Sequence, residues 1–166
     1  MFEHLETKYP LKIQNLKIKM KKIFITGGAG YVGSRLVPNL IEQGYFVTVY
    51  DIMHYTAEFL PKNNRNLNII KGDIRDTDML KKSCKDHDYF LHLACISNDA
   101  SFVLDEKLSQ SVNYDCFEPM VIAAKESNIK RFIYASSQSM YGVSNFQEEL
   151  DEEDSKKNPV TTYAKT

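Results

Sequence analysis

Short apolar runs alternate with amphipathic stretches along the chain from residue 20 onward. Five runs of mostly apolar residues predict β-strands, at residues 23–26, 46–50, 67–70, 89–93 and 131–135. Runs this uniformly apolar are typical of strands that are buried on both faces, as in a parallel sheet. Single amphipathic helices between such strands indicate an α/β fold with a doubly wound parallel sheet of the Rossmann type.

Helical spacing of apolar residues predicts the connections between the strands. The first helix runs from Tyr31 to Gln43 and stops at Gly44, whereas the second is capped by Asp76 and continues to Cys84. A later stretch repeats an apolar residue every four positions and predicts one long helix with Pro119 as a local irregularity. The repeated residues are Leu104, Leu108, Val112, Cys116, Met120 and Ala124.

The chain of 166 residues is expected to form about one domain. Met20 stands directly before the first strand, so we divide the chain into an N-terminal extension, residues 1–19, and a domain over residues 20–166. We interpret the domain as the N-terminal part of a longer fold. The extension carries no functional signal.

Charge and composition narrow the classes of partner. The 21 basic and 22 acidic residues give a formal net charge of −1, which argues against nucleic-acid binding. No apolar run approaches the roughly 20 residues of a membrane span, and the N-terminus lacks the apolar core of a signal peptide. The three cysteines show no C-x-x-C spacing, so we expect reduced thiols, no metal site and a cytoplasmic protein.

The segment TGGAGYVG, residues 26–33, fits both G-x-G-x-x-G and T-G-x-x-G-x-x-G. Glycines let the backbone turn tightly and approach a diphosphate, and the helix that follows offers free N–H groups to the anion. Glycine-rich turns also occur merely to pack a helix on a sheet, but here the motif follows a strand and opens a helix. It predicts a dinucleotide site at Gly27, Gly28, Gly30, Tyr31, Val32 and Gly33.

Asp51 ends the second strand, about 20 residues beyond the glycines, where a carboxylate would accept hydrogen bonds from an adenosine ribose. The alternative interpretation of Asp51 is an ordinary loop residue at a strand end. A 2′-phosphate would be repelled by this carboxylate, and residues 52–55 offer only His54 as compensation. The predicted cofactor is therefore NAD and not NADP.

Together these residues resemble the extended short-chain dehydrogenase/reductase family, in particular its NAD-dependent nucleotide-sugar epimerases and dehydratases of the UDP-glucose 4-epimerase type. The resemblance covers residues 20–166. Residues 72–76 (GDIRD) are similar to its G-D-x-x-D segment, and residues 92–95 (HLAC) to its H-x-A-[AG] segment. The resemblance implies further cofactor contacts at Asp73, Ile74, Leu93, Ala94, Cys95 and Asn113.

Two further segments resemble the catalytic motifs of the family. Residues 136–142 (SSQSMYG) are similar to S-S-x-x-V-Y-G, and residues 159–166 (PVTTYAKT) to P-x-x-x-Y-x-x-x-K without its lysine. The resemblance implies that Tyr163 exchanges a proton with a sugar hydroxyl during hydride transfer to NAD, while Ser137 orients that hydroxyl. A tyrosine with a pKa of about 10 needs a stabilised phenolate, which the family obtains from a lysine four residues later.

That lysine would follow Thr166, and Lys165 points to another side of the helix, so we expect negligible turnover from residues 1–166 alone. Gln138 and Ser139 stand where 4,6-dehydratases have an Asp-Glu pair, which favours epimerisation or oxidoreduction at C4. The implied partners are a nucleotide-sugar and, in the intact enzyme, a second copy of the chain. Two alternatives remain open: a non-catalytic dinucleotide-binding sensor or scaffold, and an NAD(P)-dependent reductase of a small carbonyl.

Overall fold

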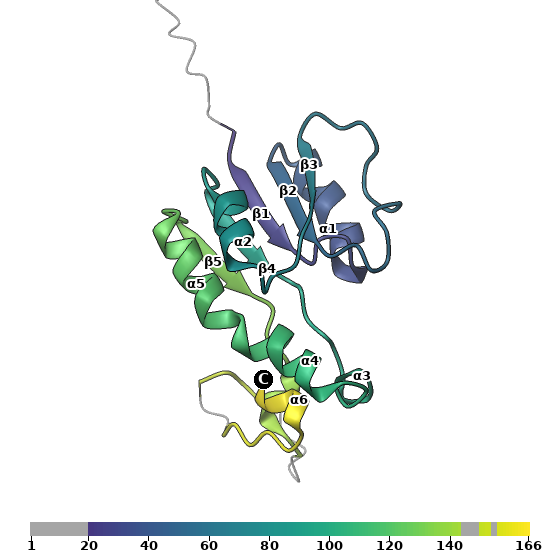
Figure 1. Ribbon diagram of the computed structural model, residues 1–166, viewed down its shortest axis with the longest axis vertical. Coiled ribbons are helices and arrows are strands. Elements are labelled where there is room, and N and C mark those ends of the chain that lie inside the picture. Colours follow the sequence, from purple (N-terminus) through teal and green to yellow (C-terminus); the bar gives the residue numbers. More distant parts are fainter. Residues whose placement is uncertain (1–19, 144–149, 154–155) are drawn as a thin grey trace, which may run out of the picture.

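The computed structural model describes residues 20–143, 150–153 and 156–166, so the predicted extension, residues 1–19, lies outside the described residues. Five strands form one parallel sheet in the order β3-β2-β1-β4-β5 (Figure 1). The strands are β1 (Lys22–Thr26), β2 (Phe46–Asp51), β3 (Leu67–Lys71), β4 (Tyr89–His92) and β5 (Arg131–Tyr134). Each begins and ends within one residue of its predicted position, and the doubly wound parallel sheet is confirmed.

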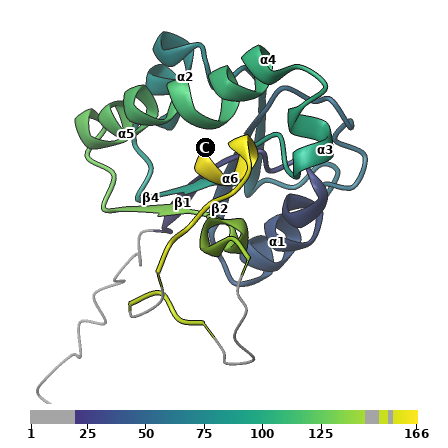
Figure 2. The ribbon, with the colours of Figure 1, turned by 90° about the horizontal axis from the view of Figure 1, so that it is seen from below.

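Helices cover both faces of this sheet. They are α1 (Tyr31–Glu42), α2 (Thr77–Cys84), α3 (Asp99–Phe102), α4 (Glu106–Gln110), the π-helix η1 (Ser111–Asp115), α5 (Phe117–Glu126), the 3-10 helix η2 (Gln138–Tyr141) and α6 (Thr162–Lys165). Helix α1 lies on one face, and α2 and α5 lie side by side on the other (Figures 1 and 2). The predicted cap of α2 is present, because the Asp76 carboxylate accepts the N–H of Met79 at 3.0 Å.

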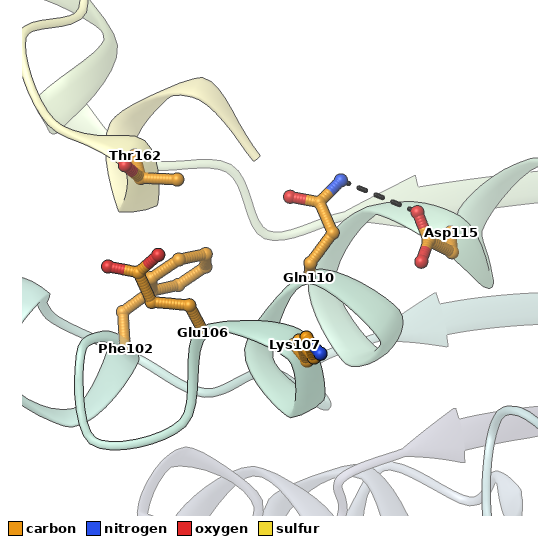
Figure 3. A pocket seen from close by; sticks show the side chains of 6 residues that line it. All are labelled: Phe102, Glu106, Lys107, Gln110, Asp115 and Thr162. Carbon is orange, nitrogen blue, oxygen red and sulfur yellow. Dashed lines mark hydrogen bonds between the residues drawn. The ribbon is translucent and has the colours of Figure 1, made fainter.

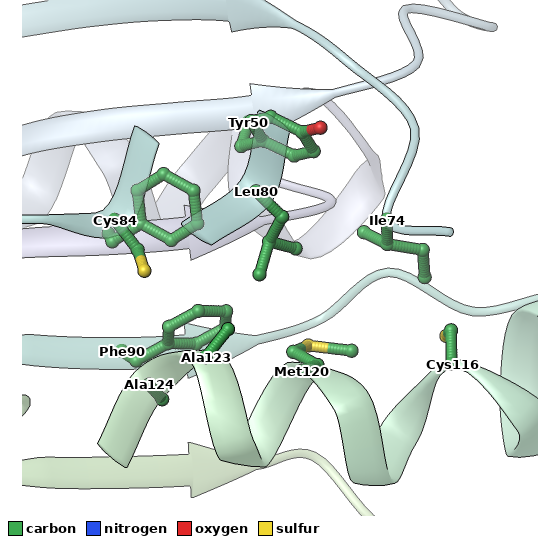
Figure 4. Close-up of a cluster of buried hydrophobic side chains, with 10 residues drawn as sticks. Tyr50, Ile74, Leu80, Cys84, Phe90, Cys116, Met120, Ala123 and Ala124 are labelled. Carbon is green, nitrogen blue, oxygen red and sulfur yellow. The ribbon is translucent and has the colours of Figure 1, made fainter. Parts of the chain in front are cut away.

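Alternate side chains of the strands point to opposite faces of the sheet, and a hydrophobic cluster lies on each face. The cluster under α2 and α5 (Figure 4) contains Phe24, Tyr50, Ile74, Leu80, Cys84, Phe90, Cys116, Met120, Ala123 and Ala124. The cluster under α1 contains Ile23, Ile25, Ala29, Val37, Val47, Val49 and Leu60. Because both clusters share β1 and β2, these two strands are the most rigidly packed part of the sheet.

The prediction of one long helix after β4 is wrong. Leu104 is 86% exposed and precedes α4, which begins at Glu106, and the π-helix η1 separates α4 from α5. Pro119 has no N–H to donate to the carbonyl of Asp115 four residues earlier, and its ring crowds that carbonyl. The π-helix ends at Asp115, so the irregularity falls one turn before the proline.

The expectation that every strand is buried on both faces holds for β1 and β2, but in β4 only Phe90 and His92 are buried, and in β3 and β5 no residue is. These two strands form the edges of the sheet, so each has a neighbour on one side only. Among the described residues, no helix is both long enough and apolar enough to cross a membrane.

Candidate active site

The glycine turn leaves β1 at the carboxyl edge of the sheet. Gly27 has a positive φ of +73°, and its N–H donates to the carbonyl of Tyr50 at 3.0 Å. A Cβ atom at Gly27 would lie 2.5 Å from the backbone nitrogen of Ala94, in the chain that leaves β4. Only glycine meets both demands, so the turn is held tightly between the ends of β2 and β4.

Helix α1 starts directly against this turn. A Cβ atom at Gly33 would lie 2.1 Å from the carbonyl oxygen of Gly28, and Gly30 caps the helix without a side-chain hydrogen bond. The first turn of α1 contains no acidic residue, and the Tyr31 side chain is 95% exposed. The first N–H groups of a helix have no partner within it and lie at the positive end of its dipole. This end of α1 can therefore bind an anion.

Asp51, the last residue of β2, lies beside the glycine turn. One carboxylate oxygen accepts the N–H of Ala29 at 3.0 Å, and the other accepts the N–H of Met53 at 2.8 Å. Met53 has a positive φ of 61°, so the chain bends sharply after the strand. Each carboxylate oxygen can accept a second hydrogen bond, which leaves Asp51 able to bind a hydroxyl group of a ligand.

The segment that follows β3 packs against the side chain of Tyr50 in β2. The Tyr50 hydroxyl donates to the backbone carbonyl of Asp73 at 2.9 Å, and a Cβ atom at Gly72 would lie 2.3 Å from the Tyr50 ring. The Asp73 carboxylate binds Arg75, whose guanidinium lowers the pKa of that carboxyl below its usual range. Ile74 is only 7% exposed and packs in the core, so its backbone is the part that a ligand could reach.

The end of β4 is fixed from two sides. His92 is buried, its Nδ1 lies 2.6 Å from the Thr26 hydroxyl, and burial lowers the pKa of its imidazole to about 4. The side-chain amide of Asn113, in the π-helix, accepts from the Ile96 N–H at 2.9 Å and donates to the Ile96 carbonyl at 3.0 Å. Residues 93–96 therefore run between the glycine turn and the π-helix.

Leu93, Ala94 and Cys95 lie on this stretch. The Leu93 N–H donates to the Thr26 carbonyl at 3.0 Å, and Ala94 touches the glycine turn. Cys95 is exposed as a residue, yet its surroundings shield the thiol enough to raise its pKa above the ordinary value. Among the described residues, no cluster of three or more His, Cys, Asp and Glu side chains could hold a metal ion.

Ser137 and Tyr163 lie beyond β5, Ser137 directly before η2 and Tyr163 in α6. The Ser137 hydroxyl accepts the N–H of Ser139 at 3.1 Å and caps η2, whereas Tyr163 lies in α6 with its ring centroid 6.4 Å from that of Phe102. Burial raises the pKa of Tyr134, and repulsion from Cys95 and Tyr163 adds to it.

Two open hollows lie on the surface of the described residues. One of about 370 Å³ lies between α4 and α6 and is lined by Phe102, Glu106, Lys107, Gln110, Asp115 and Thr162 (Figure 3). None of the predicted site residues lines it. The other, of about 690 Å³, lies on the outer side of α1 and includes two predicted residues, Tyr31 and Val32.

Sequence reasoning missed Tyr50 and Arg75, which shape this edge, whereas an isolated histidine beside a strand, such as His92, is correctly expected to be a hydrogen-bonded core residue. Thr26 and His92 join β1 to β4 through a buried hydrogen bond, and Tyr50 and Arg75 fix the two ends of Asp73. A polar residue that ends an apolar strand, as Thr26 and His92 do, was a signal available in the sequence. No comparable signal marked the role of Tyr50 as a donor.

The carboxyl edge of the sheet thus brings the N-terminus of α1 together with the carboxylates of Asp51 and Asp73. A family model described as "NAD dependent epimerase/dehydratase family" matches residues 23–166. The chain is 33% identical over 153 residues to dTDP-D-glucose 4,6-dehydratase of Homo sapiens, covering 87% of this chain and 43% of the relative.

Solved structures agree with this assignment. A UDP-N-acetylglucosamine 4-epimerase from Methanobrevibacter ruminantium, in complex with UDP-N-acetylmuramic acid, matches with a TM-score of 0.79 and 35% identity, over 89% of this chain and 47% of that one. The Thermus thermophilus UDP-glucose 4-epimerase, in complex with NAD, matches with a TM-score of 0.77 and 25% identity, over 87% and 46%. The chain spans less than half the length of each of these proteins, and it belongs to the NAD dependent epimerase/dehydratase family.

Proposed function

We propose that this chain binds NAD along the carboxyl edge of its sheet and is the cofactor-binding part of a nucleotide-sugar epimerase. The hydrogen bond from Ala29 to the Asp51 carboxylate is the observation that carries the proposal. It makes the glycine turn and the carboxylate one unit, in which a diphosphate at the helix end and a ribose at Asp51 lie side by side. The residues proposed to hold the diphosphate are Gly27, Gly28, Gly30, Tyr31, Val32 and Gly33.

The remaining contacts divide between the two ends of the dinucleotide. Asp73 and the backbone of Ile74 stand next to Asp51 and are proposed for the adenine. Leu93, Ala94, Cys95 and Asn113 stand at the end of β4 and are proposed for the nicotinamide side. This division is supported by the sheet order, because β4 and β2 lie on opposite sides of β1.

When bound, NAD would supply the acceptor for a hydride from a sugar carbon. Tyr163 is proposed to take the proton from the hydroxyl on that carbon, and Ser137 to orient this hydroxyl. The nucleotide-sugar substrate is supported by the relatives, two of which are sugar-nucleotide 4-epimerases. Gln138 and Ser139, which follow Ser137, offer an amide and a hydroxyl, and neither can serve as the acid and base of a dehydration.

Titration calorimetry with NAD⁺ and NADP⁺ tests the proposal without requiring turnover. We expect NAD⁺ to bind more tightly than NADP⁺, because the 2′-phosphate would lie against Asp51. Asp51→Asn should weaken NAD⁺ binding about tenfold, which corresponds to the loss of one hydrogen bond to a charged group. The variant should also show a smaller ratio of NAD⁺ affinity to NADP⁺ affinity.

Glu42→Gln is the matched control, because it also replaces a carboxylate by an amide. Glu42 is the last residue of α1, at the opposite end from the glycine turn, so both affinities should stay unchanged. Failure of the unaltered chain to bind either dinucleotide, or equal binding by the Asp51 variant, would overturn the proposal.

A further inference from the structure

Phe102, the last residue of α3, is buried outside the core of the sheet. The residue is 1% exposed, yet among the described residues it belongs to neither of the two hydrophobic clusters. Its ring lies beside that of Tyr163, with the ring centroids 6.4 Å apart and the ring planes tilted by 59°. Tilted aromatic rings attract one another at this separation. Phe102 therefore packs against the residue that we propose as the proton acceptor.

Helix α6, which carries Tyr163, has few contacts of its own that could fix the tyrosine. None of its four residues is buried, and a helix this short is not stable by itself. The helix packs against α3 and η2, and Phe102 and Thr162 both line the hollow between α4 and α6 (Figure 3). Phe102 is therefore in a position to fix the ring of Tyr163.

The segment that carries Phe102 is fixed at both of its ends. At its start, the side-chain amide of Asn113 bonds to both backbone groups of Ile96. At its end, the buried Ser109 hydroxyl donates to the Phe102 carbonyl at 3.0 Å. Between them, Asn98 has a φ of 72° and a ψ of 156°, which residues other than glycine adopt at a cost in free energy. Such a conformation persists only where the surrounding structure imposes it, so the direction of α3 is fixed by these contacts.

We infer that Phe102 is a positioning residue for Tyr163, and that it holds the phenol ring beside the nicotinamide side of the cofactor site. The inference rests on the proposed function, in which Tyr163 takes the proton from the sugar hydroxyl. The Phe102 side chain can neither accept a proton nor form a hydrogen bond to the dinucleotide, so it acts only through the tyrosine ring. Loss of the Phe102 ring should therefore disturb the placement of Tyr163 and leave dinucleotide binding intact.

Titration with NAD⁺, followed by NMR of the chain with ¹³C-labelled tyrosines, tests the inference. The Tyr163 signal is identified by its absence in Tyr163→Phe. In the unaltered chain, saturation with NAD⁺ should shift this signal, because the nicotinamide ring comes to lie beside the phenol. In Phe102→Ala the NAD⁺ affinity should change by less than about twofold, whereas the shift should fall to less than about half. Phe102→Leu keeps most of the apolar volume without the ring and should give an intermediate shift.

Phe90→Leu is the matched control for Phe102→Leu, because Phe90 is also fully buried but lies in β4, in the cluster under α2 and α5. It should leave the Tyr163 shift unchanged. Phe102→Leu carries the test by itself if Phe102→Ala does not fold. A full shift in the Phe102 variants, or an equal loss in Phe90→Leu, would overturn the inference and leave the proposed function standing. An unaltered chain that binds NAD⁺ without a Tyr163 shift would overturn the proposed role of Tyr163, and this inference with it.

Discussion

The candidate site consists of two regions that are held in different ways. The turn region, residues 26–33, follows the central strand β1 and includes the buried residues Thr26, Gly28, Ala29 and Gly33. The tyrosine region, residues 137–142 and 158–166, contains two four-residue helices, η2 and α6, and neither helix has a buried residue. The first region is thus fixed by the core of the sheet, and the second by contacts within itself and with α3.

The difference follows from the number of neighbouring strands to which each backbone is hydrogen-bonded. The turn region bonds to β2 through the Tyr50 carbonyl and to β4 through the Leu93 N–H, so three strands hold it. A helix of four residues is not stable by itself, and α6 depends on side-chain packing such as that of Tyr163 on Phe102. Segments with few buried groups open at a lower free energy than the core does. Binding of a dinucleotide and placement of the tyrosine are therefore separable properties.

Gly33→Ala should have the largest effect. The new Cβ would lie 2.1 Å from the Gly28 carbonyl oxygen and 2.4 Å from its carbon, and these are backbone atoms between β1 and α1 that cannot move aside. We expect a loss of about 3 to 5 kcal/mol in the free energy of unfolding, together with the loss of NAD⁺ binding. Urea denaturation followed by circular dichroism measures the first, and calorimetry the second.

Gly44→Ala is the matched control, at the other end of α1. Gly44 also has a positive φ, of 87°, but a Cβ atom there would meet nothing within 4 Å. Its cost should be about 1 to 2 kcal/mol, that of an alanine in the left-handed conformation, with NAD⁺ binding intact. If the two variants were equally stable, the turn region would not be held as tightly as we describe.

The next largest effect is a pH dependence beside the turn region, where β4 ends. His92 bonds Thr26 in the turn region and stacks on Tyr134, and burial lowers the pKa of its imidazole to about 4. The unfolded chain, with a histidine pKa of about 6.5, binds the proton first, so stability is full above pH 6.5 and is lost as the pH falls toward 4. The loss should reach about 2 to 3 kcal/mol, measured by urea denaturation at pH 7.5 and 4.5.

A variant isolates this contribution from other groups. His87 is also partly buried with a lowered pKa, so it titrates in the same direction. His92→Asn keeps a polar group near Thr26 but has no proton to gain, and it should flatten the pH dependence more than His87→Asn does. An unchanged pH dependence in His92→Asn would contradict the assignment.

The fold and the turn region could be predicted because their signals are local. A run such as residues 46–50 reads as a strand without knowledge of its neighbours, and the glycines mark places where a Cβ has no room. The backbone alone requires Gly27 and Gly33, which is why a motif captures them.

Other features depend on contacts between segments far apart in the chain. The π-helix could not be foreseen from apolar spacing, because Leu104 and Leu108 continue the repeat although Leu104 lies outside any helix. Arg75 donates to the hydroxyl of Ser111, 36 positions away, and the hydrogen bond between Thr26 and His92 spans 66 positions. A single sequence can mark Thr26 and His92 as polar ends of apolar strands, but in neither pairing does it show which residue is the partner.

The smallest expected effect on the whole fold is that of Gly142→Ala, and it sharpens the comparison most. A Cβ atom at Gly142 would lie 2.0 Å from the Asn158 carbonyl oxygen, an overlap as severe as that at Gly33, and Gly142 also has a positive φ of 72°. The atoms it meets belong to the tyrosine region, where the Asn158 N–H donates to the Met140 carbonyl at 2.9 Å. This segment can move away without disturbing the core.

We therefore expect Gly142→Ala to lower the free energy of global unfolding by less than about 1 kcal/mol and to leave NAD⁺ affinity unchanged. Amide hydrogen exchange should show faster exchange at Asn158 and Ala164, whose N–H groups are bonded only within the tyrosine region, and unchanged protection at Ile25 and Val49 in the sheet. Equal overlaps at Gly33 and Gly142 would then have unequal costs, because the cost of an overlap is set by how freely the atoms it meets can move. If Gly142→Ala destabilised the sheet as much as Gly33→Ala, the two regions would be one cooperative unit.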